Sequence, residues 1–166
     1  VATITLNNPD RKNALSPRMV NELLYALDDA RDNPEVRVVV LTGAGESFCA
    51  GGDLKQMAGD GPELERRGDF DDLLLRFTGL NKPVVAAVRG HAMGGGVGLV
   101  AASDFAIAEA DATLGTPEIK RGLFPMMIMA PLQRVMPRRE LMTMMRLGDK
   151  LSARERVDLL LDEGTF

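Results

Sequence analysis

The apolar and polar positions of the chain follow two periods, which predict strands and helices in turn. Runs of β-branched and small apolar residues predict strands at 1–6, 36–41, 84–88, 104–108 and 112–115. Apolar residues at three- and four-residue spacing predict helices at 17–33, 63–80, 95–102, 125–136, 137–147 and 152–161, with one or two turns at 53–58. Ser16 and Pro17 mark the start of the first helix, and Asn33 and Pro34 stop it. The first half of segment 63–80 is charged and contains Gly68, so we expect the helix to be weak there and mobile.

This order of elements predicts an α/β protein. Apolar strands separated by helices are typical of a mainly parallel, buried sheet that helices cover. Ligands of such sheets bind at the carboxyl ends of the strands. Two glycine-rich segments, 43–53 and 90–96, each follow a predicted strand. Both therefore emerge where a binding site is expected.

Composition narrows the class of protein. The chain has 166 residues, of which 45% are hydrophobic and 27% charged, which indicates a globular domain. Cys49 and His91 are its only cysteine and histidine, so no internal disulfide, cysteine cluster or multi-histidine metal site is predicted. A net charge of −4, dispersed basic residues and the absence of tryptophan argue against a nucleic-acid partner. The sequence has no apolar run of bilayer length and no secretory pattern at its start, so we expect a cytoplasmic protein without a membrane partner.

The two glycine-rich segments contain the sequences FCAGGDL at 48–54 and GHAMGGG at 90–96. Glycine lets backbone N–H groups approach a ligand closely, and the second segment also opens a helix, whose N-terminus favours negative charge. Two N–H groups that converge on one oxygen form an oxyanion hole. A single segment of this kind is more often a tight turn, but two of them, each after a buried strand, favour a site. The run that begins at Gly94 is no dinucleotide fingerprint, because Leu99 stands where the third glycine is needed.

FCAGGDL resembles the first signature of the crotonase superfamily, the enoyl-CoA hydratases and isomerases. The sequence NKPVVAAVRGHAMGGGVGLVAASDFAIA at 81–108 resembles the second signature, and segments 3–16 and 116–125 also match the family. The resemblance covers residue 1 to about residue 148. It implies a crotonase-like β-β-α superhelix, acyl-CoA thioester chemistry without a separate cofactor, and a homotrimer or hexamer.

The resemblance also implies roles for individual residues. The N–H groups of Gly52 and Gly95 would hold the thioester oxygen and stabilise an enolate. The path of coenzyme A, as part of the substrate, would be lined by Lys12, Ala14, Ala50, Asp53, Leu54 and Lys55. Glu118 would be the acid and base, with a pKa raised by the apolar acyl chain beside it. Taken without the family, Glu118 is better explained as a surface carboxylate that caps the next turn.

One departure from the family pattern concerns catalysis. Hydratases of this family commonly use two glutamates, and Gly98 occupies the position of the first. A second carboxyl is available from Asp53, Glu63, Glu65 or Asp69, or these residues simply form a solvated surface. The prediction is an enoyl-CoA hydratase that adds water across the double bond of a 2-enoyl-CoA. The alternatives are an enoyl-CoA isomerase, a thioester hydrolase, or a non-catalytic acyl-CoA-binding or oligomerisation module.

The remaining predictions concern single residues and the ends of the chain. We expect His91 to make a local hydrogen bond, Cys49 to be a small buried residue, and the methionines of 126–145 to line an acyl pocket, a subunit interface or a helix core. The sequence LSARERVDLLLDEGTF at 151–166 departs from the family and resembles the opening of biotin-dependent acyl-CoA carboxyltransferases. We therefore expect a core at 1–148 that lacks the family's first strand, and a truncated helical segment at 149–166.

Overall fold

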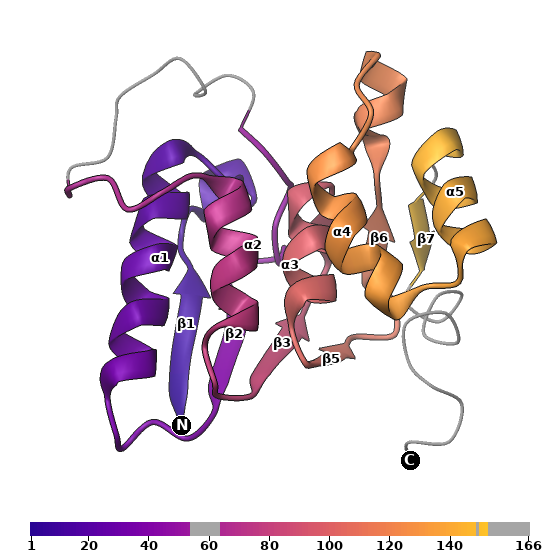
Figure 1. The fold of residues 1–166 in the computed structure, drawn as a ribbon. Coiled ribbons are helices and arrows are strands. Elements are labelled where there is room, and N and C mark those ends of the chain that lie inside the picture. Colours follow the sequence, from indigo (N-terminus) through magenta and orange to yellow (C-terminus); the bar gives the residue numbers. More distant parts are fainter. Residues whose placement is uncertain (54–63, 149, 153–166) are drawn as a thin grey trace.

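The computed structural model describes residues 1–53, 64–148 and 150–152, and it contains two sheets (Figure 1). The larger sheet is parallel throughout and runs in the order β1 (Ala2–Leu6), β2 (Val39–Gly43), β3 (Val84–Val88) and β5 (Phe105–Ala108). In the smaller sheet β6 (Thr113–Gly115) lies between β4 (His91–Met93), which is parallel to it, and β7 (Lys150–Ser152), which is antiparallel. The predicted α/β class with a mainly parallel sheet is confirmed.

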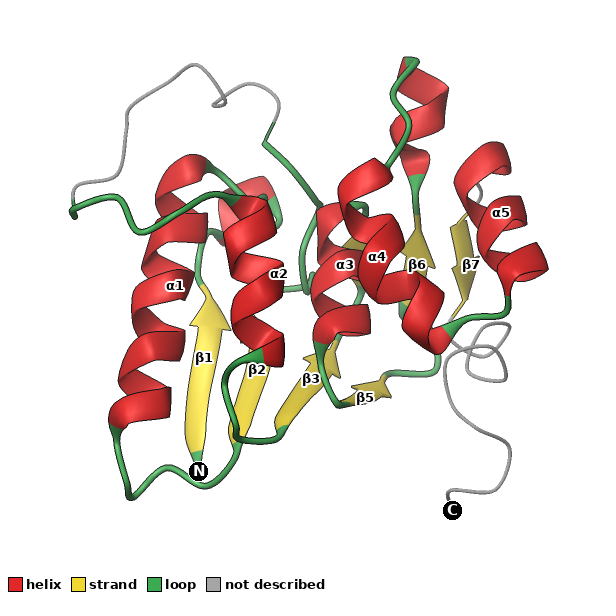
Figure 2. Ribbon diagram, viewed as in Figure 1, coloured by secondary structure: helices red, strands yellow, loops and turns green. Residues whose placement is uncertain are grey.

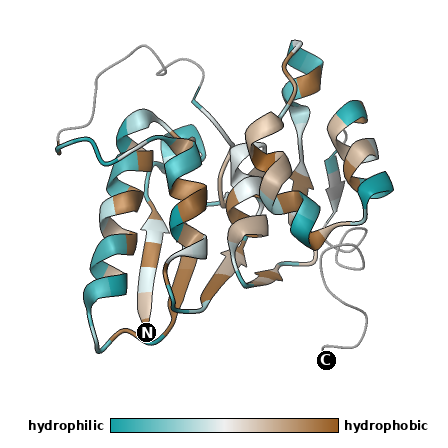
Figure 3. Cartoon of the chain, viewed as in Figure 1, coloured by the Kyte–Doolittle hydropathy of each residue, from teal (hydrophilic) through white to brown (hydrophobic). Residues whose placement is uncertain are grey.

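Helices cover one face of the larger sheet, in front of the strands in Figure 2. The covering helices are α1 (Pro17–Asp32), α2 (Phe70–Thr78) and α3 (Gly95–Ala102). Helix α4 (Met126–Val135) packs against α3, and α5 (Arg138–Leu147) packs against α4 and the short 3-10 helix η2 (Pro117–Arg121). A second 3-10 helix, η1 (Pro9–Arg11), follows β1. Apolar side chains of α1 and α2 pack with β1 and β2, and Leu24, Leu41 and Leu73 are completely or almost completely buried. Figure 3 shows the polar residues of α1 on its outer side. No helix in the described part of the chain is long and apolar enough to cross a membrane.

The small residues of α3 explain its central position. Its sequence GGVGLVAA has no bulky polar side chain, and residues 96–101 are buried. Small side chains let neighbouring backbones approach closely, so α3 packs against α2, α4 and β4 at once. The N-terminus of α3, where the second glycine-rich segment ends, therefore lies inside the molecule, next to the site described below.

Segment 64–69 is not helical, which makes the prediction of a helix over 63–80 wrong in its first half. Side chains of α1 hold this segment instead. Asn21 Oδ1 accepts a hydrogen bond from Arg67 N at 2.7 Å, and Asn21 Nδ2 donates one to Glu65 O at 3.1 Å. The buried carboxylate of Asp28 pairs with Arg67 at 2.6 Å. Asp69 then caps α2 in a capping box with Asp72, so the helix begins only at residue 70.

Three strands also depart from the prediction, and two of them, β4 and β7, are only three residues long. β2 begins at Val39, three residues later than predicted. Residues 91–93 were predicted as part of a turn and form β4. Ser152 was predicted to open a helix and instead belongs to β7, while residues 153–161 of that helix, and 54–58 of the predicted turns, lie outside the described residues. Strands of three residues carry too little periodic pattern to be recognised locally, and here tertiary pairing decides them.

Candidate active site

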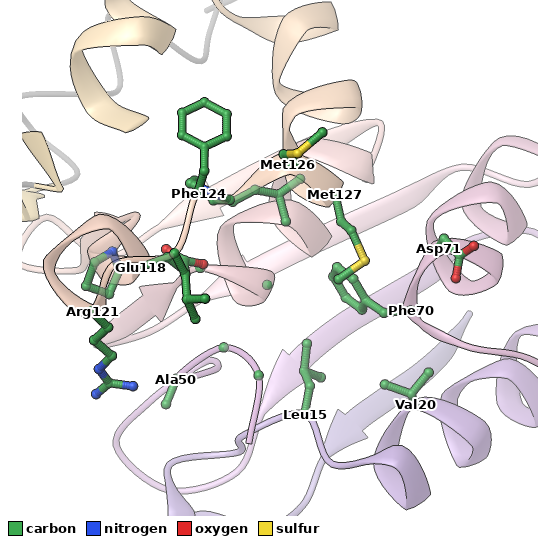
Figure 4. A pocket seen from close by; sticks show the side chains of 18 of the residues that line it. Leu15, Val20, Ala50, Phe70, Asp71, Glu118, Arg121, Phe124, Met126 and Met127 are labelled. Atoms are coloured by element: carbon green, nitrogen blue, oxygen red, sulfur yellow. The ribbon is translucent and has the colours of Figure 1, made fainter. Parts of the chain in front are cut away.

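A cavity of about 630 Å³ opens where the two glycine-rich segments meet (Figure 4). It lies between the N-terminal ends of α1, α2 and α3, segment 117–125 and the start of α4. Most of its wall is apolar, which suits a ligand with a hydrocarbon part. Its principal lining residues are Leu15, Val20, Ala50, Gly52, Phe70, Gly95, Glu118, Arg121, Met127 and Ile128.

Backbone hydrogen bonds hold the two glycine-rich segments side by side. Cys49 N donates to His91 O at 2.9 Å, and Met93 N donates to Cys49 O at 2.8 Å. On its other side the first segment is fixed by Leu15 N, which donates to Gly51 O at 2.8 Å. These contacts bring together two glycines that are more than forty positions apart: a Cβ built on Gly95 would lie 3.7 Å from Gly52 N.

The N–H groups of Gly52 and Gly95 have no hydrogen-bond partner within the described residues. Gly95 is the first residue of α3, where an amide has no acceptor within the helix. Gly95 is half-buried and Gly52 is exposed, and both line the cavity. Two such donors in the wall of one cavity make an arrangement that can receive an oxygen that carries negative charge.

Two further glycines make the close approach of these segments possible. Gly51 has a φ of +89°, and a Cβ there would lie 2.7 Å from Met93 O. Gly94 has a φ of +50°, and a Cβ there would collide with the carboxyl group of Glu118. Glycine at position 94 therefore gives Glu118 the room to lie against the start of α3.

Glu118 lies in η2, directly after Pro117, and its carboxyl group points into the cavity (Figure 4). The segment is anchored by Thr116 Oγ1, which donates to Met144 O at 2.8 Å. Glu118 Oε2 is buried and has no hydrogen-bond partner in the described part of the chain. Burial raises the pKa of the Glu118 carboxyl, and its own backbone N–H and the charge of Arg121 oppose that rise. A half-buried carboxyl with a raised pKa is suited to proton transfer.

The space beside Gly98 is filled by apolar side chains. A Cβ on Gly98 would lie 2.5 Å from Ile128 Cγ2 and 3.5 Å from Phe70 Cζ. A carboxyl side chain at this position therefore has no room unless Ile128 shifts. Glu118 lies on this side of the cavity and Asp71 lies at the opposite end; Asp69, which also lines the cavity, comes two residues before Asp71 in the chain.

The packing of Gly98 against α4 gives a prediction for stability. Gly98→Ala is expected to lower the free energy of unfolding by about 1–3 kcal/mol, because the new methyl group overpacks Ile128. Urea unfolding measures the change. In an Ile128→Ala background the clash is absent, so the same substitution should cost clearly less. An equal cost in both backgrounds would show that contact with Ile128 is not the cause.

The residues predicted along the path of coenzyme A lie in different surroundings. Ala50 lines the cavity, and Ala50 N donates to Lys12 O at 2.9 Å, so segment 12–14 adjoins it. The Asp53 side chain is only 4% exposed and pairs with Arg11 at 2.8 Å. Leu54 and Lys55 lie outside the described residues, as does Glu63, which was considered as a second carboxyl; Glu65 is exposed.

Two side chains near the cavity have structural roles. His91 Nδ1 and Thr113 Oγ1 are 2.6 Å apart across β4 and β6, which is the local hydrogen bond that was predicted. Cys49 is completely buried, and burial raises the pKa of its thiol to about 12. A thiol in this state is no nucleophile at neutral pH. The structure describes no group of three or more histidine, cysteine or acidic residues that is arranged to hold a metal ion.

Several cavity residues were not predicted. Arg121 follows Glu118 by one turn of η2, a spacing that would have pointed to it. Phe70 and Ile128 reach the cavity only through tertiary packing, which the sequence does not display. The methionines of 126–145 differ in their surroundings. Met126 and Met127 line the cavity, Met136, Met144 and Met145 are buried in the core, and Met129 and Met142 are half-buried.

A family model described as "Enoyl-CoA hydratase/isomerase" matches residues 1–159. The chain belongs to the enoyl-CoA hydratase/isomerase family. This membership confirms the crotonase superfamily that the two signatures indicated. It also confirms the crotonase-like fold, because solved structures of this enoyl-CoA hydratase/isomerase family superpose on the chain.

Two of these structures are crystal structures of enoyl-CoA hydratases. The one from Mycobacterium smegmatis has a TM-score of 0.84 at 33% identity, and the alignment covers 95% of this chain and 63% of that one. The one from Bacillus anthracis has a TM-score of 0.83 at 35% identity, with 93% and 61% covered. A curated relative, "Enoyl-CoA hydratase domain-containing protein 3, mitochondrial" of Danio rerio, is 35% identical over 158 residues, which are 93% of this chain and 55% of that protein. The chain thus spans less than two thirds of the length of these family members.

Proposed function

We propose that this chain carries the catalytic core of an enoyl-CoA hydratase, which adds water across the double bond of a 2-enoyl-CoA thioester. The observation that carries the proposal is the shared cavity of three groups. The N–H groups of Gly52 and Gly95, which donate to no described residue, supply two donors, and Glu118 supplies a half-buried carboxyl. Membership of the family supplies the class of chemistry.

In this proposal the thioester oxygen accepts hydrogen bonds from Gly52 N and Gly95 N. The acyl chain lies along the apolar wall of the cavity, and the coenzyme A part leaves past Ala50 and segment 12–14. No metal or redox cofactor takes part, because the thioester carbonyl itself accepts the electron pair. Preorganised donors at such an oxygen are worth several kcal/mol of transition-state stabilisation.

The reaction requires one proton to leave water and one to reach the α-carbon. The Glu118 carboxylate takes a proton from water while the hydroxide oxygen bonds to the β-carbon. The electron pair of the double bond moves to the thioester oxygen, giving an enolate that Gly52 and Gly95 stabilise. The protonated Glu118 then returns its proton to the α-carbon as the carbonyl re-forms. One carboxyl can therefore perform both transfers, which agrees with the apolar surroundings of Gly98.

A second candidate is an enoyl-CoA isomerase, and the packing of Gly98 favours it. Ile128 and Phe70 fill the space beside Gly98, so no second carboxyl stands there to hold a water molecule. A single carboxyl can remove a proton from the α-carbon of a 3-enoyl-CoA and return it to the γ-carbon. The same two donors would stabilise the dienolate that forms between these steps.

The absorbance of crotonyl-CoA separates these functions. Hydration removes the conjugated thioester band, and we expect the purified protein to remove it. Isomerisation instead creates that band from 3-hexenoyl-CoA, and thioester hydrolysis releases a free thiol that a chromogenic disulfide detects. If none of these signals appears and α-hydrogens of butyryl-CoA do not exchange with heavy water, the proposal of catalysis is overturned and a binding module remains. The trimeric or hexameric assembly and the cytoplasmic location stay predictions.

A further inference from the structure

The cavity extends well beyond the groups that would react. Glu118 and Arg121 lie at one end of it and Asp71 lies at the other, with Phe70 between them (Figure 4). The ring of Phe70 is next to Gly95, because a Cβ built on Gly95 would lie 3.4 Å from Phe70 Cζ. Its volume of about 630 Å³ is in the range of pockets that enclose a drug-sized molecule, much larger than a four-carbon acyl group. The wall between the two ends is apolar and includes Leu15, Val20, Met127 and Ile128.

The end that lies away from Glu118 carries negative charge. The carboxylate of Asp69 is paired with Arg66, and that of Asp72 accepts a hydrogen bond from Asp69 N at 2.8 Å. Asp71 is exposed, lines the cavity and forms no ion pair among the residues that the structure describes. The N-terminus of α2 contributes only about half a positive charge, so it does not offset this carboxylate.

Three arginines of the same region pair with a carboxylate that does not line the cavity. Arg67 and Arg76 both pair with the buried carboxylate of Asp28 on α1, where Arg31 joins them at 2.9 Å. Arg67 also stacks over the ring of Tyr25, 3.6 Å from its centroid. These contacts fix the guanidinium groups against α1. None of these guanidinium groups pairs with Asp71 in the described part of the chain.

We propose that Asp71 selects the acyl group: the site takes neutral, apolar enoyl chains that extend past Phe70 and disfavours chains that end in a carboxylate. This inference rests on the proposed function of the cavity. Each methylene that the apolar wall buries should improve kcat/KM about fourfold. A terminal carboxylate would lose water along the wall and then meet the like charge of Asp71.

The test compares 2-decenoyl-CoA with its analogue that carries a carboxylate at the far end of the chain. The wild-type protein should prefer the neutral substrate by about tenfold or more in kcat/KM. Asp71→Asn should narrow that ratio about three- to tenfold, since an exposed like-charge contact is worth roughly that factor. Raising the salt concentration should narrow the wild-type ratio in the same way and change the ratio of the variant little.

Two controls make the result specific. Asp29→Asn removes an exposed carboxylate of α1 that does not line the cavity, so it should leave the ratio unchanged. Crotonyl-CoA carries no charge on its short acyl group, so its turnover measures hydration separately from the choice between the two long substrates. An unchanged ratio in Asp71→Asn, or a wild-type preference for the carboxylate analogue, would overturn this inference while leaving hydration intact. If crotonyl-CoA is not hydrated, the proposed function fails separately, and the dissociation constants of decanoyl-CoA and its carboxylate analogue decide the inference in the same way.

Discussion

Replacing Glu118 with glutamine should reduce the hydration of crotonyl-CoA by about 10³-fold or more. General acid–base catalysis by one group contributes about 10²–10⁴-fold, and in the proposed mechanism Glu118 performs both proton transfers. Glutamine keeps the shape of the side chain but can neither take nor return a proton. The two donors at Gly52 and Gly95 remain, so the affinity for a saturated acyl-CoA should change little.

The measurement is steady-state kinetics, with acyl-CoA binding followed by calorimetry. Glu140→Gln is a matched control, because Glu140 Oε2 is also buried without a partner in the described part of the chain, yet it does not line the cavity. That variant should retain turnover. If Glu118→Gln keeps more than a tenth of the wild-type rate, Glu118 is not the acid and base.

The raised pKa of Glu118 also predicts how activity and stability depend on pH. Activity should fall as the pH drops through this raised pKa, so the acid limb of kcat/KM should lie above the ordinary carboxyl range of about 4.5. The folded protein holds this proton more tightly than the unfolded chain does, so the contribution of Glu118 to the free energy of unfolding is largest at low pH. Stability is then lost as the pH rises through the raised pKa. Glu118→Gln lacks this loss and should unfold at a higher urea concentration than the wild type at neutral pH, with the difference disappearing in acid.

The sequence predicts much of this site because its chemistry depends on short local motifs. The segments around Gly52 and Gly95 each follow a buried strand, and their glycines indicate backbone that approaches a ligand. That these two segments meet, with Glu118 beside them, was implied by the resemblance to a family and not by any local pattern. The structure supplies the reason for the meeting in the backbone bonds between Cys49 and β4.

Features that depend on contacts between distant segments were not predicted. Segment 64–69 has enough helix-forming residues to suggest a helix, but Asn21 and Asp28 on α1 bind its backbone and side chains instead. In the sequence Gly98 is only a departure from the family pattern. In the structure Ile128 and Phe70 occupy the space that a side chain at position 98 would need. Such pairings are non-local, so hydrophobic periodicity does not report them.

Gly52→Pro should lower kcat about 10²–10³-fold, because proline removes the N–H group proposed to bind the thioester oxygen. Position 52 allows an unusually clean comparison. A Cβ built on Gly52 meets no atom within 4 Å, and its φ is not in the left-handed region. Gly52→Ala therefore adds a side-chain carbon but keeps the N–H group, and it should retain activity within a few fold of the wild type.

The neighbouring backbone bonds support this comparison. Gly52 N donates to no described residue, while Gly51 O and Asp53 N make the bonds to Leu15 that hold the segment. Removing one N–H group at 52 thus costs no hydrogen bond of the fold. Thermal unfolding of both variants checks that the structure survives. If the two variants unfold alike and lose activity alike, steric change near the cavity explains the loss and the donor does not. A large loss of kcat in the proline variant alone, with KM little changed, would show that the N–H group of Gly52 stabilises the transition state more than it stabilises the bound substrate.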